Sequence, residues 1–367
     1  MLNTIISLCE KRGFLRKLML PRLNAEQFKF GPTGLLLREI LRTEWFYSLV
    51  INKDISIFLS DENFTETYNF ARTLCMDKLP FGIAEIVENR RHTSDGELIA
   101  YYNSIIKNGD INFAKFFNKE DQALLRCTVF TPATDSTQFF HQWQRQRRIW
   151  WRKCSLNPGR YRLTDIKTDD SQMQHVDILA DYPWNSQILE TIVLHPSPKK
   201  INKVQLQCCY KFMDGKRKVE AHAVVSEINM AVMFLNTICD AFDETTFNAK
   251  SRTLLRLHRK LAPYKISFAV SGTTSAVVSE LKDLALYLTK QLRVNHVSTL
   301  YLPNNSKLTL EAQWKQYDQL GIPFNVLLNE GTLKDGVAYL RSRDTTLKEQ
   351  IHITNLVDYV EKLFKNY

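Results

Sequence analysis

Basic residues surround two adjacent tryptophans in the stretch RQRRIWWRK, residues 145–153. If this stretch is helical, residues three and four positions apart, such as Arg145, Arg148 and Arg152, share one face. A row of cations of this kind can neutralise the phosphates of duplex DNA, and its affinity falls as salt rises. The alternative is a solvated basic face with both tryptophans anchored in the core. The candidate DNA-binding residues are Arg145, Arg147, Arg148, Arg152 and Lys153.

Two more arginines end the predicted strand VAYLRSR near the carboxyl terminus. Arg341 and Arg343 could contact phosphates or stack on the splayed bases of an RNA. Together with Asp344 they could instead face a protein partner. A third possibility is internal, with Arg343 paired to Asp344 or Glu349 so that the turn is fixed. The sequence leaves these alternatives open, and Arg341, Arg343 and Asp344 are candidate partner-interface residues.

Motifs of enzymes are missing from the chain. It contains neither HExxH nor GxSxG, and the stretch DGKRKVE lacks the upstream glycines of a phosphate-binding loop. The 7 cysteines are scattered without a CxxC pair, which argues against a zinc site and a disulfide framework. We therefore expect no catalytic residue, no metal and no cofactor, and a reducing compartment.

The composition is that of a globular protein with an excess of positive charge. The 367 residues are 44% hydrophobic and 24% charged, which suits two domains with cores of their own. A net charge of +10 favours polyanionic partners, nucleic acid first. No apolar run is long enough for a membrane span. The basic, acid-poor start, residues 1–22, is typical of an organelle transit peptide, or else forms the first helix of the fold.

Strands and helices alternate in the carboxyl-terminal part. The pattern predicts strands at 266–270, VSTLYLP, PFNVLL and VAYLRSR, with a helix after each of the first two. A turn at Asp335-Gly336 is expected before the fourth strand, and a terminal helix capped by Thr354 after it. This order indicates an α/β domain with a largely parallel sheet. A basic stretch, 251–265, is predicted to be helical up to Pro263.

Residues 1–255 have a less regular pattern. Helices are predicted near 34–50 and 61–77, a strand in DQALLRCTVFTP, and strands of an antiparallel sheet at 204–211 and 221–226. We expect an α+β domain over 1–255 and the α/β domain over 256–367.

Two stretches resemble the glycyl-type class II aminoacyl-tRNA synthetases. FGPTGLLLREILRTEWFY, residues 30–47, is similar to their first signature, in which a Gly-Pro turn opens a long helix. KLPFGIAEIVENRRH, residues 78–92, resembles the second, whose arginine holds the ATP α-phosphate. The resemblance puts that arginine at Arg91 and a threonine, Thr93, in place of its acidic partner. ISLCEKRGFL resembles the opening helix of these enzymes, so the basic start is expected to belong to the fold.

The third signature is degenerate. It needs closely spaced glycines and an arginine, whereas VVSEINMAVMFLNTICDAF has neither, and Ala231 stands about where the arginine should be. Without that cation, charge on the departing pyrophosphate has no clamp. The resemblance therefore implies a degenerate ATP site, marked by Arg91, Thr93 and Ala231, and no adenylation.

Further blocks resemble a family derived from such enzymes. LHRKLAPYKISFAV, LRSRDTTLKEQIHITNLVDYVEKL and RQRRIWWRKCSLNPG are similar to the accessory subunits of the mitochondrial DNA polymerase, polymerase gamma, which are non-catalytic relatives of the glycyl and prolyl synthetases. The resemblance runs almost from end to end. It implies a class II synthetase-like α+β domain with an antiparallel sheet, followed by an α/β domain of the anticodon-binding type.

The implied function is that of a non-catalytic processivity subunit in the mitochondrial matrix, at the nucleoid. Its expected partners are the catalytic subunit and double-stranded or primer-template DNA, with no membrane. Vertebrate members carry a longer insertion where this chain has only residues 51–79, and that insertion joins two accessory subunits. The short segment favours one accessory subunit per catalytic subunit, as in insect-type members. The alternatives are a working class II synthetase and a tRNA-binding synthetase paralogue.

Overall fold

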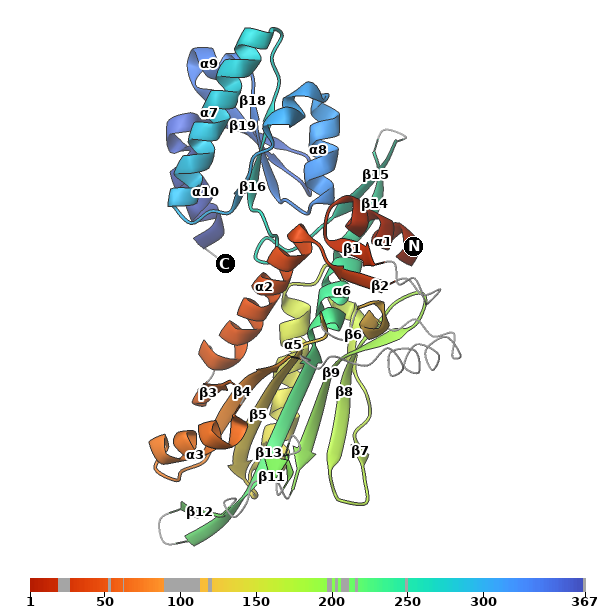
Figure 1. Cartoon of the computed structure of the whole chain (residues 1–367), viewed down its shortest axis with the longest axis vertical. Coiled ribbons are helices and arrows are strands. Elements are labelled where there is room, and N and C mark those ends of the chain that lie inside the picture. Colours follow the sequence, from red (N-terminus) through yellow and green to blue (C-terminus); the bar gives the residue numbers. More distant parts are fainter. Residues whose placement is uncertain are drawn as a thin grey trace.

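Two sheets with their covering helices stand one above the other in the computed structural model (Figure 1). The structure describes residues 1–18, 27–51, 54–61, 63–88, 113–117, 121–196, 200–201, 204–205, 211–214, 217–247 and 250–365. The predicted site residues Arg91 and Thr93 lie outside these ranges.

The first sheet has nine strands in the order β3-β4-β5-β13-β9-β8-β6, with β12 beside β13 and β7 beside β8. Its pairs are antiparallel except for β3 and β4 at the edge, which run parallel. The strands are β3 (Ile57–Ser60), β4 (Phe81–Val87), β5 (Leu124–Pro132), β6 (Tyr161–Leu163), β7 (Lys167–Thr168), β8 (Gln174–Asp181), β9 (Ser186–His195), β12 (Lys211–Asp214) and β13 (Arg217–Asn229).

Helices pack around this sheet, and two of them correspond to the helices predicted near 34–50 and 61–77. The helix α2 (Pro32–Phe46) continues into a π-helical turn, η1 (Tyr47–Ile51), and α3 (Phe64–Leu74) follows β3. The basic stretch lies in α5 (Ser136–Lys153), and the stretch that resembles the third signature, residues 224–242, includes α6 (Met230–Ala241). Shorter pieces complete this part: α1 (Leu2–Lys11), β1 (Leu15–Leu18), β2 (Gln27–Phe30), η2 (Phe113–Phe116), η4 (Pro158–Arg160), β10 (Lys200–Ile201), β11 (Val204–Gln205), β14 (Phe242–Phe247) and β15 (Lys250–Leu255).

The basic start of the chain belongs to the fold, as expected. One side of α1 is buried, including Ile5 and Cys9, and the chain then turns into the β1–β2 hairpin. The turn at Gly13 packs against the start of α2, where Gly31 is the N-cap and Pro32 opens the helix. A Cβ on Gly34 would lie 2.0 Å from the carbonyl oxygen of Phe14. The GPTG stretch therefore lets two backbones approach closer than any side chain allows.

We expect Gly34→Ala to lower the free energy of unfolding by about 1–3 kcal/mol, because the added methyl group must push backbone apart. Urea denaturation followed by tryptophan fluorescence measures the change. Gly159→Ala is the matched control, since a Cβ there meets nothing within 4 Å. Equal stability of the two variants would contradict the close-approach argument.

The second sheet has the order β17-β16-β18-β19-β20. The prediction of a largely parallel sheet is wrong for half of it: β16 pairs in parallel with β17 and β18, but β18–β19 and β19–β20 are antiparallel. Its elements are β16 (Ile266–Val270), α7 (Ser275–Val294), β17 (Thr299–Leu300), η5 (Pro303–Lys307), α8 (Leu310–Gln319), β18 (Phe324–Leu328), α9 (Glu330–Asp335), β19 (Val337–Ser342), β20 (Lys348–His352) and α10 (Ile353–Lys365).

Three local predictions fail in this part. The polar turn before the last helix contains the strand β20, which pairs with β19 through a short hairpin. The last helix begins at Ile353, so Thr354 lies inside its first turn and is not the cap. The stretch 251–265 is not helical, because its first residues form β15 against β14.

The two sides of the second sheet belong to different cores. Residues facing α7 and α10, among them Phe268 and Leu340, form a core of their own. On the α8 side, Tyr317, Leu320 and Leu327 join the main core that also fills the first sheet. The division of the chain at 255/256 therefore remains a prediction, because apolar packing runs across it.

Candidate functional site

Arg147 lies on the side of α5 that packs against the first sheet. Its side chain is only 1% exposed, and its Nε donates to Oε1 of Glu190 at 2.7 Å. Its guanidinium also lies 4.3 Å from the ring centroid of Trp150. The prediction that Arg147 contacts DNA is wrong, because no phosphate can reach a buried, paired guanidinium.

Glu190 of β9 is the buried partner that fixes this side of α5. It is fully buried and accepts hydrogen bonds from Arg147, from Ser226 Oγ and, at 2.7 Å, from Trp151 Nε1. A buried carboxylate is tolerated only when donors satisfy it in this way. The contacts hold the helix to β9 and β13 and set which side chains face outward.

The outward side of α5 carries the remaining basic candidates. Arg145, Arg152 and Lys153 are exposed and Arg148 is partly buried. The helix contains no acidic residue, so its outer charge is entirely positive. Ile149, 62% exposed, lies among these cations. We call Arg145, Arg148, Arg152 and Lys153 the α5 basic face.

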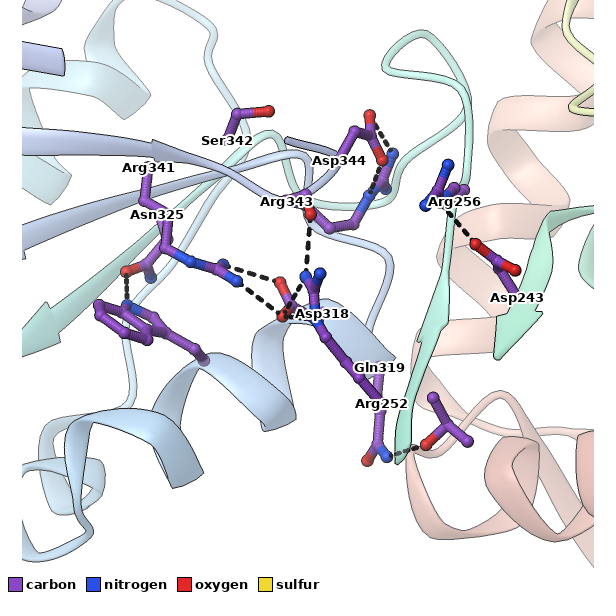
Figure 2. A network of polar contacts seen from close by, with 12 residues as sticks. Asp243, Arg252, Arg256, Asp318, Gln319, Asn325, Arg341, Ser342, Arg343 and Asp344 are labelled. Carbon is purple, nitrogen blue, oxygen red and sulfur yellow. Dashed lines mark hydrogen bonds and ion pairs between the residues drawn. The ribbon is translucent and has the colours of Figure 1, made fainter. Parts of the chain in front are cut away.

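Arg341 belongs to a buried ion network between the second sheet and the β14–β15 hairpin (Figure 2). Its two Nη atoms donate to Asp318 at 3.0 and 3.1 Å, and Arg252 of β15 donates to the same carboxylate at 2.7 Å. Arg341 and Asp318 are 4% and 2% exposed. The network ties α8 and β19 of the second sheet to the β14–β15 hairpin.

Arg343 is buried beside this network. It donates to the carbonyl oxygens of Gly321 at 2.8 Å and Leu257 at 3.0 Å, and to Asp344 at 2.9 Å. The internal pairing with Asp344 is therefore the alternative that the structure bears out. The placement of Arg341 and Arg343 on a partner interface or an RNA surface is wrong, since neither reaches solvent, whereas the Asp344 side chain is half exposed.

Ala231 lies in the first turn of α6 and is fully buried. Its backbone N–H donates to Asn229 Oδ1 at 2.9 Å, so the side chain of the N-cap residue, not a ligand, occupies this helix end. Since α6 contains no basic residue, this helix brings no cation to the region of the third signature.

A pocket of about 90 Å³ opens where α2, α5 and α6 meet the segment 256–261. Tyr161 and Asp240 are among its buried lining residues, while Tyr47 and Lys153 are exposed at its rim. Burial raises the pKa of Tyr161 to about 12, so its hydroxyl stays protonated at neutral pH. No motif or spacing in the sequence predicts this pocket.

Among the described residues, no group of three or more His, Cys, Asp or Glu side chains could hold a metal ion. None of the helices described is long and apolar enough to cross a membrane.

The sequence is similar to a known domain family and to DNA polymerase subunits. Residues 269–363 match the anticodon binding domain family. Over 98% of its length the chain is 24% identical to DNA polymerase subunit gamma-2 of Mus musculus, and the match covers 90% of that protein. The chain is similar to this subunit along nearly its whole length. The mitochondrial subunit gamma-2 of Drosophila melanogaster is 28% identical over 62% of this chain and 63% of its own length.

Synthetases are relatives as well. The glycine–tRNA ligase of Borreliella burgdorferi is 25% identical over 79% of the chain and 62% of that enzyme. An α+β domain built on a nearly antiparallel sheet, followed by an anticodon-binding domain, is a class II synthetase-like architecture, which confirms the predicted fold class. The likeness to gamma-2 subunits over nearly the whole chain supports an accessory role in a DNA polymerase.

Several residues that organise the site were not predicted. Glu190 and Asp318 are single acids whose partners lie far away in the chain, and no local pattern marks them. Asp240 carried a usable signal, because it is the one charged residue in the largely apolar helix α6. An acid in such a helix is buried and therefore paired or functional.

Proposed function

We propose that this chain is a non-catalytic accessory subunit of the mitochondrial DNA polymerase, which binds the catalytic subunit and duplex or primer-template DNA in the matrix nucleoid. The main support is the likeness to DNA polymerase subunit gamma-2 along 98% of the chain. Relatives from Xenopus laevis and Drosophila melanogaster are named mitochondrial. The α5 basic face supports the DNA contact.

The proposed role is to keep the polymerase bound to DNA for longer, and this role needs no catalytic step. A subunit that adds positive surface beside the duplex slows dissociation more than it speeds association. By linkage, polymerase elements that it orders bind primer-template more tightly. Product length on a primed single-stranded template, with and without the chain at moderate salt, tests the proposal. Unchanged product length with no binding to the catalytic subunit would overturn it.

The lack of adenylation rests on α6. Ala231 is buried where the resemblance puts a cation, and α6 has no lysine or arginine. Because departing pyrophosphate needs preorganised positive charge, we expect ATP–pyrophosphate exchange at background level with any amino acid. Exchange above background with glycine would favour the synthetase alternative.

We expect the double variant Arg145→Glu/Arg152→Glu to bind duplex DNA at least about tenfold more weakly near physiological salt, because it removes two phosphate contacts and adds repulsion. The slope of log affinity against log salt should fall by about 2. Fluorescence anisotropy with a labelled duplex measures both. Lys290→Glu/Lys307→Glu makes the same change in net charge at exposed positions of the second domain. Equal losses in both double variants would show that net charge alone attracts the DNA.

A stoichiometry of one accessory subunit per catalytic subunit is also proposed. Between α2 and β4 the described chain holds η1, the short strand β3 and the single helix α3, which is little material for a helical dimer interface. Light scattering on the purified chain and on its complex with the catalytic subunit measures the ratio. A two-to-one complex would refute this part alone.

A tRNA-binding role is the second candidate, favoured by the match of residues 269–363 to the anticodon binding domain family. Competition between tRNA and primer-template DNA for the chain separates the two. Loss of tRNA competition in Arg145→Glu/Arg152→Glu would place both nucleic acids on the α5 basic face.

A further inference from the structure

Asp240 has an unusual environment at the pocket between α2, α5 and α6. The residue is 4% exposed and lines the pocket. Its Oδ2 accepts from Ser155 Oγ and from the N–H of Leu156, both at 2.8 Å. Its Oδ1 has no hydrogen bond from any described residue, and the nearest cation, Arg160 Nε, is 3.7 Å away.

A buried carboxylate oxygen without a donor is costly. A ligand that brings an N–H to Oδ1 would remove this cost, so the pocket favours a hydrogen-bond donor. An ammonium ligand suits it poorly, because Lys153 lines the pocket without an ion-pair partner among the described residues, whereas Arg256 and Lys260 are paired with Asp243 and Glu44. The donor expected here is therefore neutral.

The aromatic side chains that line the pocket favour a ligand with a flat ring. Tyr47, Trp150, Trp151 and Tyr161 all line the pocket, and the two indole rings lie 5.0 Å apart in an edge-to-face arrangement. Aromatic side chains of this kind stack on nucleobases whatever their sequence. At the rim, Lys153 is exposed and forms no ion pair with any other described side chain, so it is available to a phosphate.

The α5 basic face leads directly to this pocket. Lys153 belongs to both, and Trp150 lies one turn before Cys154 on the same end of the helix. A nucleic-acid strand held along Arg145, Arg148 and Arg152 would bring its next nucleotide to the rim. The pocket is thus placed for a base that is not paired in a duplex.

We propose that this pocket binds the purine base of an unpaired nucleotide, with Asp240 Oδ1 accepting a base N–H, the aromatic walls stacking on the ring and Lys153 contacting the phosphate. The nucleotide is either free or the end of a DNA strand on the α5 basic face, and only the second source rests on the proposed function.

The first experiment tests the pocket without DNA. Calorimetric titration of the full chain with dGMP is expected to give binding at least about tenfold tighter than with deoxyribose 5-phosphate, since stacking and one charged hydrogen bond are lost with the base. Asp240→Asn puts an amide in place of the free acceptor, and Tyr47→Ala removes an exposed wall residue with little risk to folding. Both variants should lose the preference for dGMP.

Equal affinity for dGMP and the sugar phosphate would overturn the proposal, as would a dGMP preference that survives in both variants. Binding of a peptide from the catalytic subunit that Asp240→Asn abolishes, with no binding of dGMP, would assign the pocket to a protein side chain and would also overturn the proposal. Circular dichroism on each variant separates loss of binding from loss of fold.

The second experiment distinguishes the source of the nucleotide. Three otherwise identical duplexes are compared by anisotropy: blunt, ending in one unpaired guanine, and ending in one unpaired abasic residue. A guanine preference of about tenfold, absent in Asp240→Asn, assigns the pocket to a DNA end. Binding of dGMP without that preference assigns it to a free nucleotide. If blunt duplex binds but neither guanine nor dGMP is preferred, the pocket proposal fails and the proposed function stands.

Discussion

Glu190→Ala is expected to lower the free energy of unfolding by about 3–5 kcal/mol, because it leaves the buried guanidinium of Arg147 without a counter-charge. The indole N–H of Trp151 loses its acceptor in the same step. Since these contacts hold α5 to the sheet, DNA binding by the α5 basic face should weaken as well. Urea denaturation followed by tryptophan fluorescence gives the first value, and duplex anisotropy the second.

The double variant Arg147→Met/Glu190→Gln is the control for this prediction. It removes the cation and keeps an acceptor for Trp151, so it should recover at least half of the loss. Glu227→Gln is a second control: that carboxylate pairs with Arg126 but is about a third exposed, and we expect a loss under about 1 kcal/mol. A double variant as unstable as Glu190→Ala would show that packing, not the buried ion pair, holds the helix.

Asp318→Asn is expected to lower the free energy of unfolding by about 3 kcal/mol and to loosen the second sheet from the β14–β15 hairpin. One carboxylate balances Arg252 and Arg341, so the substitution leaves two guanidinium groups facing a neutral amide in a buried place. Hydrogen exchange read by mass spectrometry should show faster exchange in β15 and in the segment 256–265, while β16 stays protected.

The control is an aspartate–arginine pair of the same kind on the surface. Asp181 pairs with Arg162 at 2.8 Å, but both side chains are about half exposed, so Asp181→Asn should cost less than about 1 kcal/mol. Faster exchange in all elements of Asp318→Asn alike would mean that the two sheets unfold as one unit, against the role given to this network.

The sequence contained more information about α5 than the prediction used. Phe140, Trp143, Arg147 and Trp151 recur at spacings of three and four, so Arg147 occupies a place in the apolar stripe. Arg145 and Arg152 fall outside that stripe, and their exposure followed from the helix alone. The sequence could not predict that Glu190 pairs with Arg147, because two residues 43 positions apart form no local pattern.

The arginines of β19 failed as interface candidates for a related reason. At the end of a strand, alternation tells which residues share a face but not what covers that face. Tyr339 and Arg341 share one face of β19, and β15 and α8 bury it. The covering hairpin comes from a stretch predicted to be helical, so the burial of Arg341 and Arg343 could not have been inferred. The fold class did follow, from the Gly-Pro turn, the regular helix spacing and the family resemblance.

The second sheet has a core of its own on the side of α7, but on the side of α8 it packs into the main core of the protein. This limits how the protein can be divided into fragments for study. A fragment of residues 256–367 would expose apolar side chains that the main core buries in the intact chain: Tyr317, Leu320, Ile322 and Leu327. Such a fragment would aggregate or bind apolar surfaces without selectivity, and apparent capture of a partner by it would be misleading. Mapping of the polymerase contact therefore calls for point substitutions in the intact chain.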